Sequence, residues 1–305
     1  MDKPFKTIEE QIELLEARGV ATDDATPEVL LREGYYSVIN GYKTPLIDKS
    51  KTKSAKDDCY LPGTSFADVY ALFSFDRELR MLFFKYFAIT EEALKTASAY
   101  CFSEAHIGEN EPYLDANNCD ASPNQIGILL SDFNTALGRN PRRMPKHKLY
   151  LEHYSKNHDE VPIWVLMKYL TLGQAFKFYC FQPESIRNEI AKTFSSLYAN
   201  DHEKPIRITS RRLRLAYDHI KDFRNICAHD ERFYCAKVSP SHDIAVADVV
   251  EDMQLMPSKD AYVELLAQYA AMLLKLSRSL GPDVLNKVLK ETRVESVYGA
   301  FSVNE

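Results

Sequence analysis

Apolar side chains recur at helical spacing along most of this chain. The longest such stretch runs from Thr64 to about Ala105 without a proline or a glycine, and it predicts one long helix that forms the spine of the fold. Shorter stretches with the same spacing predict further helices, at 7–18, 123–137, 148–157, 163–172, 174–181, 183–197, 206–229 and 262–274 and after residue 282. We expect the helices on either side of Gly173 to be hinged at that residue.

Local signals mark where some helices begin and where the chain turns. Thr7 begins a capping box, and Thr26 stands as a cap residue before Pro27 at the first helical position. The aromatic segment 34–42 is expected to form a buried corner in which its tyrosines pack. The segment 49–58 is polar, small and charged, which is typical of a flexible loop.

The pattern predicts an all-α fold. The sequence has no internal repeat and no convincing run of alternating strands, which leaves at most a small β element near 234–250. We expect a single domain over 1–305, with a helical and aromatic N-terminal subregion at 3–60, a core at 64–235 and a C-terminal helical extension at 236–305. With only 10 glycines in 305 residues, a nucleotide-binding sheet with glycine-rich turns is disfavoured.

Charge narrows the choice of partner. The 38 basic and 44 acidic residues give a net charge of −6, which argues against a protein that only coats nucleic acid. A nucleic-acid site must therefore be a local basic patch, and two stretches without acidic residues are candidates. Their candidate RNA-binding residues are Lys204, Arg207, Arg211, Arg212 and Arg214 in one stretch and Arg142, Arg143, Lys146 and Lys148 in the other. Ordinary solvated faces are the alternative interpretation of both.

Other composition signals are weak or negative. The six cysteines show no Cys-x-x-Cys pair, as expected for reduced thiols in the cytosol. The N-terminus has no apolar signal core, and no stretch approaches the ~20 apolar residues of a membrane span. We therefore expect a soluble, cytoplasmic protein. The sequence also shows no recognisable cluster of metal ligands and no phosphate-binding loop, so neither a metal nor a cofactor is expected.

The helix predicted within 206–229 carries two stripes of opposite character. The apolar stripe, expected to face the core, contains Leu213, Ala216, Ile220, Phe223 and Cys227. The polar stripe on roughly the opposite side contains Asp218, Asp222, Asn225 and His229. This second stripe is expected to face a cleft or a symmetric partner.

Arg224 and His229 close this helix and carry the strongest chemical signal. The planar guanidinium of an arginine suits phosphate oxygens, and a histidine can transfer a proton near neutral pH. Together such groups can cleave RNA without a metal, through attack of a 2′-hydroxyl on the neighbouring phosphate. The alternative is that both side chains only satisfy the last carbonyls of the helix.

Helical geometry limits how this pair can act. Residues five apart lie about 140° apart on a regular helix, so Arg224 and His229 do not point the same way. Either the helix end is distorted or the site is shared with a second copy of the chain. Asn225 and His229 are four residues apart and do share a face.

With these residues in view, the chain resembles the Abi-like family of bacterial phage-defence proteins, of the AbiD/AbiF abortive-infection type. That family is similar to a branch of the HEPN superfamily, which shares an Arg-x(4–6)-His motif. The resemblance covers about residues 3–235 and follows a series of short motifs in the family's order. These are Lys3-Pro4, Gly34-Tyr35-Tyr36, Asn40-Gly41-Tyr42, Phe75-Asp76-Arg77-Glu78-Leu79-Arg80, Pro162-Ile163-Trp164 and Arg224–Arg232.

The resemblance implies a HEPN-like helical bundle with additional helices and an endoribonuclease that acts in phage defence or as a toxin. It implies that Arg224 holds the scissile phosphate, that His229 is the general acid or base and that Asn225 orients one of them. Arg232, at the end of the motif, joins the candidate RNA-binding residues. A homodimer or higher oligomer and a structured non-coding RNA that regulates the activity are implied as partners.

Two further functions remain open at this point. The chain could be a non-catalytic HEPN module that binds RNA or acts as a scaffold. It could also be a transferase that modifies nucleotides with the same two residues. Cleavage of RNA in EDTA, leaving a 2′,3′-cyclic phosphate and a 5′-hydroxyl, separates the nuclease from the binding module.

Overall fold

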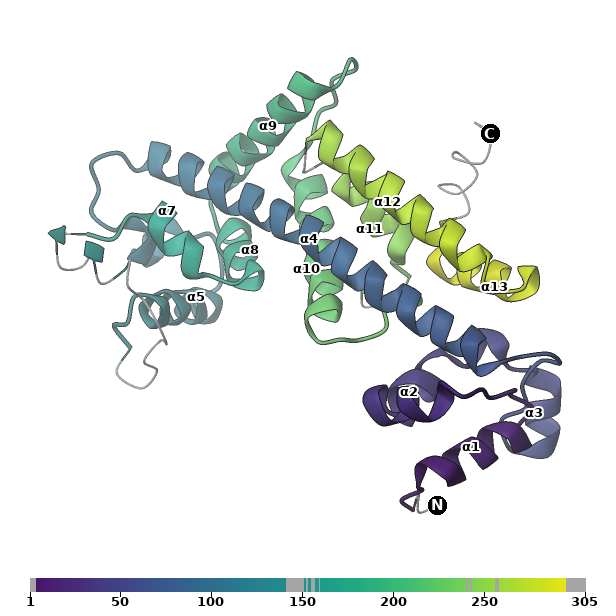
Figure 1. The fold of residues 1–305 in the computed structure, drawn as a ribbon. Helices are drawn as coiled ribbons and strands as arrows, with labels where there is room; N and C mark the ends of the chain where they lie inside the picture. Colours follow the sequence, from purple (N-terminus) through teal and green to yellow (C-terminus); the bar gives the residue numbers. More distant parts are fainter. Residues whose placement is uncertain are drawn as a thin grey trace. The chain divides into compact units, whose positions relative to one another are not determined.

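The computed structural model describes residues 4–140 and 160–294, apart from 240, 242, 256 and 257, together with 151, 153, 154, 157 and 158. These residues form helices joined by non-helical connections, which confirms the all-α prediction (Figure 1). The small β element expected near 234–250 is an isolated antiparallel bridge between Val238 and Ile244. No helix in the described ranges is both long enough and apolar enough to cross a bilayer.

The chain divides into two compact units, and each is built from segments that are separated in the sequence. The first unit contains residues 1–83, 226–247 and 265–305, and the second contains 84–225 and 248–264. Three helices have residues in both units: α4 (Phe66–Ala105), α10 (Ser210–Ala228) and α12 (Lys259–Ser277). The 40 residues of α4 confirm the long helix predicted from the apolar spacing.

The first unit gathers the N-terminal elements around the start of α4. Besides parts of α4 and α12, its elements are α1 (Ile8–Ala17), α2 (Thr26–Glu33), the π-helix η1 (Tyr36–Asn40), the 3-10 helix η2 (Thr44–Leu46), α3 (Lys49–Ala55) and α13 (Pro282–Thr292). Phe83 of α4 packs against Phe233 and Tyr269, with ring centroids 4.8 and 5.7 Å away. This aromatic cluster joins α4, α12 and the segment after α10 into one core.

The second unit packs shorter helices on the rest of α4. Besides parts of α4, α10 and α12, its elements are η3 (Pro112–Leu114), η4 (Ala116–Asn118), α5 (Pro123–Ala136), α7 (Ile163–Leu166), η5 (Met167–Tyr169), α8 (Leu172–Cys180), α9 (Glu184–Asp201) and most of α11 (Val246–Met253). The buried Tyr217 of α10 donates its hydroxyl to the Thr90 carbonyl of α4, at 2.7 Å. The predicted core stripe is confirmed at Leu213, Ala216 and Phe223, which are fully buried.

A side-chain cap accounts for one helix start that the sequence predicts and for one that it misses. The predicted capping box of Thr7 forms at α1. Segment 49–58, expected to be a loop, contains α3, because the Asp48 carboxylate accepts hydrogen bonds from the Ser50 and Lys51 amides and starts the helix. Pro183 precedes α9 as predicted.

Two other expectations are wrong by a few residues. The break expected at Gly173 falls two residues earlier, because Thr171 caps α8 and leaves Gly173 inside the helix. Thr26 is the first residue of α2 rather than its cap, and the Asp23 carboxylate accepts a hydrogen bond from the Thr26 amide instead. The helix predicted at 148–157 lies largely outside the described residues.

A histidine–aspartate pair joins two helices of the second unit. His219 of α10 places Nδ1 2.7 Å from the Asp252 carboxylate of α11. The hydrogen bond to this carboxylate raises the pKa of His219 above its ordinary value of 6.5. Because the folded state favours the protonated histidine, the pair stabilises the fold most below about pH 6.5, and this stabilisation is lost as the pH rises through the raised pKa.

We expect Asp252→Asn to lower the free energy of unfolding at pH 5.5 by no more than about 1 kcal/mol, because the pair is partly exposed and screened by solvent. At pH 9 the difference from the unsubstituted chain should shrink, because His219 is then neutral. Urea denaturation at both pH values measures the effect. An equal loss at the two pH values would show that the contact does not depend on the histidine charge.

Candidate functional site

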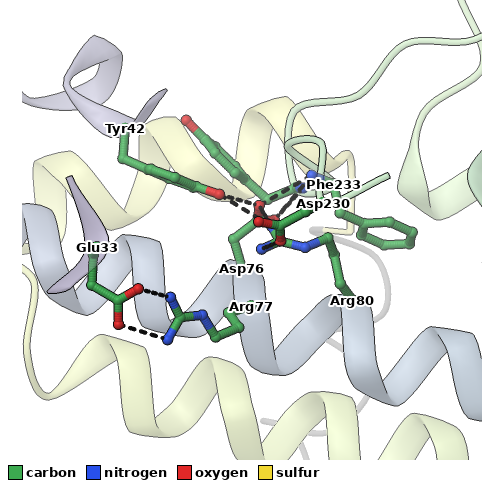
Figure 2. A network of polar contacts seen from close by, with 8 residues as sticks. Glu33, Tyr42, Asp76, Arg77, Arg80, Asp230 and Phe233 are labelled. Carbon is green, nitrogen blue, oxygen red and sulfur yellow. Dashed lines mark hydrogen bonds and ion pairs between the residues drawn. The ribbon is translucent and has the colours of Figure 1, made fainter. Parts of the chain in front are cut away.

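One buried carboxylate in the first unit gathers three segments of the chain (Figure 2). Asp76 of α4 has no exposed surface and accepts a hydrogen bond from the Tyr42 hydroxyl, at 2.7 Å. It also accepts hydrogen bonds from the backbone amides of Phe233 and Tyr234, at 3.1 and 2.6 Å. Asp76 therefore fixes the segment that follows His229 against α4.

Arg80, one turn further along α4, completes this network. Its guanidinium donates to the Asp76 carboxylate and to the Tyr42 hydroxyl, at 2.7 and 3.1 Å, and forms an ion pair with Asp230 (Figure 2). Burial raises the pKa of the Asp76 carboxyl, while Tyr42, the two amides and the Arg80 cation act in the opposite direction. Burial and the Asp76 charge also raise the pKa of Tyr42, so that its hydroxyl remains a donor. We call Tyr42, Asp76, Arg80 and Asp230 the Asp76 network.

The Asp76 network determines how the chain leaves α10. Asp230 has a φ of +56°, a left-handed conformation that residues other than glycine rarely adopt. Its ion pair with Arg80 holds it there, and the Glu231 amide donates to the Ile226 carbonyl at 3.1 Å. His229 stands between the last residue of α10 and this turn, and it is exposed. His229 therefore lies directly between the end of α10 and the left-handed turn at Asp230.

Arg224 belongs to the second unit and is anchored to α4. Its Nε lies 3.7 Å from the Glu91 carboxylate, and its guanidinium lies over the Phe84 ring, 5.5 Å from the centroid. Glu91 also accepts a hydrogen bond from the buried Lys95, at 2.7 Å, and Lys95 donates to the Leu170 carbonyl. Arg224 is thus half-buried and held by α4.

Sequence reasoning missed the residues that hold the motif in place. Glu91 and Lys95 show only the four-residue spacing of an ordinary helix pair, and nothing in the sequence links them to Arg224. Asp76 and Arg80 appeared in the family resemblance without a role. Asn225, the third predicted catalytic residue, is exposed in the last turn of α10.

The predicted basic residues that the structure describes all lie at the surface. Those of the second unit are Lys204, Arg207, Arg211, Arg212 and Arg214. None of the five forms an ion pair with another described residue, so their charges face solvent. Arg232, in the first unit, is exposed and donates to the Gly41 carbonyl at 3.1 Å. The other predicted basic residues, Arg142, Arg143, Lys146 and Lys148, lie outside the described residues.

Metal binding has no obvious location in the described part of the chain. No group of three or more histidine, cysteine, aspartate or glutamate side chains there is arranged to hold an ion. No disulfide joins any of the six cysteines.

We expect Asp76→Asn to lower the free energy of unfolding by about 3 kcal/mol or more, because it leaves the buried Arg80 cation without its main counter-charge. Glu33→Gln is the matched control. It breaks the ion pair between Arg77 of α4 and Glu33 of α2, whose side chains are 42% and 16% exposed, and should cost less than about 1 kcal/mol (Figure 2). Urea denaturation of both variants measures the difference. Equal effects would mean that the Asp76 network does not anchor the fold.

The comparisons with known proteins give one match. A family model described as Abi-like protein matches residues 28–235, which is more than half of the chain. The matched range includes the Asp76 network and both Arg224 and His229. No match was found among curated proteins or among solved structures.

Proposed function

The chain belongs to the Abi-like protein family, and from this premise we propose that it is an endoribonuclease of phage defence that acts by abortive infection. Arg224 and His229 are its catalytic residues, in a site of the HEPN type. Arg224 holds the scissile phosphate, His229 transfers a proton, and Asn225 orients one of the two. The substrate is RNA.

The observation that carries this proposal is the way in which side chains of α4 hold the chain at the Arg224–His229 motif. His229 is exposed, while the residue after it is fixed by the Asp76 network and the backbone beyond is held by the Asp76 carboxylate. A histidine that merely ended a helix would not require a left-handed residue directly after it, held by an ion pair to the buried Arg80. An exposed histidine on a rigid turn suits proton transfer, because its orientation is set before the substrate binds.

The reaction follows from the two side chains. A general base takes the proton of the 2′-hydroxyl, and the 2′-oxygen attacks the adjacent phosphorus. The bond from phosphorus to the 5′-oxygen breaks, and a general acid gives the leaving oxygen a proton. Arg224 stabilises the charge that develops on the non-bridging oxygens. The products are a 2′,3′-cyclic phosphate and a 5′-hydroxyl, and no step requires a metal.

This reaction needs both an acid and a base, and one motif supplies a single histidine. A homodimer that brings two motifs together would supply the second. A structured RNA that binds the exposed arginines would give the cell a means of restraining the activity. Both partners are part of the proposal.

One observation favours the second candidate, a non-catalytic module that binds RNA. Arg224 is already engaged by Glu91 and lies over Phe84, so its guanidinium has a structural role without any ligand. In that case RNA binds and is not cut. Incubation with RNA in EDTA, followed by analysis of the RNA ends, separates the two candidates.

We expect His229→Ala to lower the rate of RNA cleavage by about 10²–10⁴-fold, because the motif loses its proton-transferring group. Arg224→Lys keeps the charge but loses the two-pronged contact to phosphate, so cleavage should also fall sharply. Both variants should still bind RNA and should no longer arrest the growth of host cells. Gel analysis of a labelled RNA and growth after induced expression measure these effects.

His158→Ala is the control for the histidine substitution, because His158 is exposed and lies away from the motif in the sequence. It should cleave RNA as the unsubstituted chain does. If His229→Ala cleaves at the full rate, Arg224 and His229 only form a helix end and the nuclease proposal is wrong.

A second expectation concerns the basic residues at the start of α10. Reversing the charges of Arg211, Arg212 and Arg214 to glutamate should weaken RNA binding, because fewer counterions are released. The plot of log affinity against log salt should become less steep by about 2, at about 0.7 for each lost phosphate contact. Fluorescence anisotropy with a single-stranded RNA at several salt concentrations measures this slope.

Three exposed lysines of the first unit provide a matched control with the same change in net charge. They are Lys49, Lys53 and Lys56. Their reversal to glutamate should leave the slope nearly unchanged. Equal slopes for the two triple variants would place the RNA path elsewhere.

A further inference from the structure

A cavity of about 430 Å³ opens in the first unit, beside the turn that follows His229. It is lined by the π-helix η1, by Phe73 and Arg80 of α4 and by the segment 230–237 with Ile226. Asp230, the residue after His229, is part of its wall. The cavity is thus built on the Asp76 network and borders the motif.

The π-helix gives this cavity an unusual wall. π-helices are rare and are frequently found at functional sites. In η1, Val38 and Ile39 are buried in the core, whereas Tyr36, Ser37 and Asn40 line the cavity. A single turn therefore has one face for the fold and one for the cavity.

The cavity face of η1 presents groups that could contact a ligand and that no other part of the described structure covers or bonds. Tyr36 is 77% exposed, although a tyrosine ring gains free energy when it is covered. The side chains of Ser37 and Asn40 form no hydrogen bond with another described residue. The wall therefore offers an aromatic face, a hydroxyl group and an amide that is both a donor and an acceptor.

The charges around the cavity favour a base over a phosphate. Arg80 is paired with Asp76 and Asp230, Lys237 of the lining is paired with Glu291, and the Glu231 carboxylate lines the same space. Arg232 lies at the wall and is exposed. The charges of the lining therefore largely cancel and give a phosphate no net attraction, whereas a nucleobase is flat, uncharged and bordered by donors and acceptors.

We propose that this cavity binds one unstacked nucleobase of an RNA, an inference that rests on the proposed RNA-binding function. The base stacks on the Tyr36 ring, and the Asn40 amide pairs with the donor and acceptor groups of its edge. Arg232 is placed to contact the phosphate of the same nucleotide. The cavity would then select which nucleotide lies beside the bond that is cleaved.

The first experiment measures binding of a fluorescein-labelled 12-nucleotide single-stranded RNA by anisotropy, in the non-cleaving His229→Ala background. Tyr36→Ala should weaken binding about 5- to 100-fold, the effect of losing one stacked base. Tyr36→Phe keeps the ring and should bind nearly as well as the parent. Tyr100→Ala, which removes a 65% exposed tyrosine of the second unit, is the matched control and should have no effect.

The second experiment identifies the base. A set of these RNAs, each with an abasic site at a different position, should show one position at which the missing base weakens binding. In the Tyr36→Ala chain that penalty should disappear, because the partner of the base is gone. Asn40→Ala should reduce the preference between the four bases at that position. Equal melting temperatures confirm that the variants remain folded.

A third experiment separates failure of the cavity from failure of the nuclease. Saturation-transfer NMR with the four nucleoside monophosphates tests the cavity without any cleavage. Binding that Tyr36→Ala abolishes supports the cavity, even if RNA is never cut. The cavity proposal is overturned if Tyr36→Ala and Asn40→Ala change the binding of neither the 12-nucleotide RNA nor the monophosphates. If the unsubstituted chain still cleaves RNA in that case, the nuclease proposal stands. No binding of any nucleotide to the unsubstituted chain overturns the cavity proposal as well.

Discussion

The buried charge of Asp76 is the constraint on which the first unit depends. A carboxylate without solvent costs several kcal/mol unless donors surround it. Here the donors come from Tyr42, Arg80 and the backbone of Phe233 and Tyr234, which belong to three different parts of the sequence. None of these parts can move away without leaving the Asp76 carboxylate short of donors, so the segment at Phe233 and Tyr234 is held against α4.

The same helix anchors both ends of the Arg224–His229 motif, through different side chains. In the first unit, α4 holds the residue after His229 through Arg80, and in the second it holds Arg224 through Glu91. The two anchors differ in kind. The first shapes the backbone and leaves the histidine exposed, whereas the second engages the arginine side chain itself. An RNA phosphate would therefore compete with Glu91 for Arg224, whereas the His229 side chain has no hydrogen bond or ion pair with another described residue.

The sequence predicts the helices well because apolar spacing and capping boxes are local signals. The long helix from Phe66 to Ala105 follows from its spacing alone. The helix at Lys49–Ala55 was missed, because it has no apolar stripe and depends on the single cap at Asp48. For the site, the motif names Arg224 and His229. Asp76 and Glu91 could not be assigned a role, because their partners lie far along the chain and only packing brings them together.

In the π-helix Tyr36–Asn40, the number of residues determines which side chains face the cavity. Each residue of an α-helix turns the chain by about 100°, so removing one residue here would rotate the side chains before the deletion relative to those after it. Tyr42 would remain tied to Asp76, and Tyr36 would swing away from the cavity it now lines. Substitutions can change this wall gradually, but a one-residue insertion or deletion would change it in a single step. Such length changes, more than amino-acid replacements, would mark where two related chains differ in what this cavity accepts.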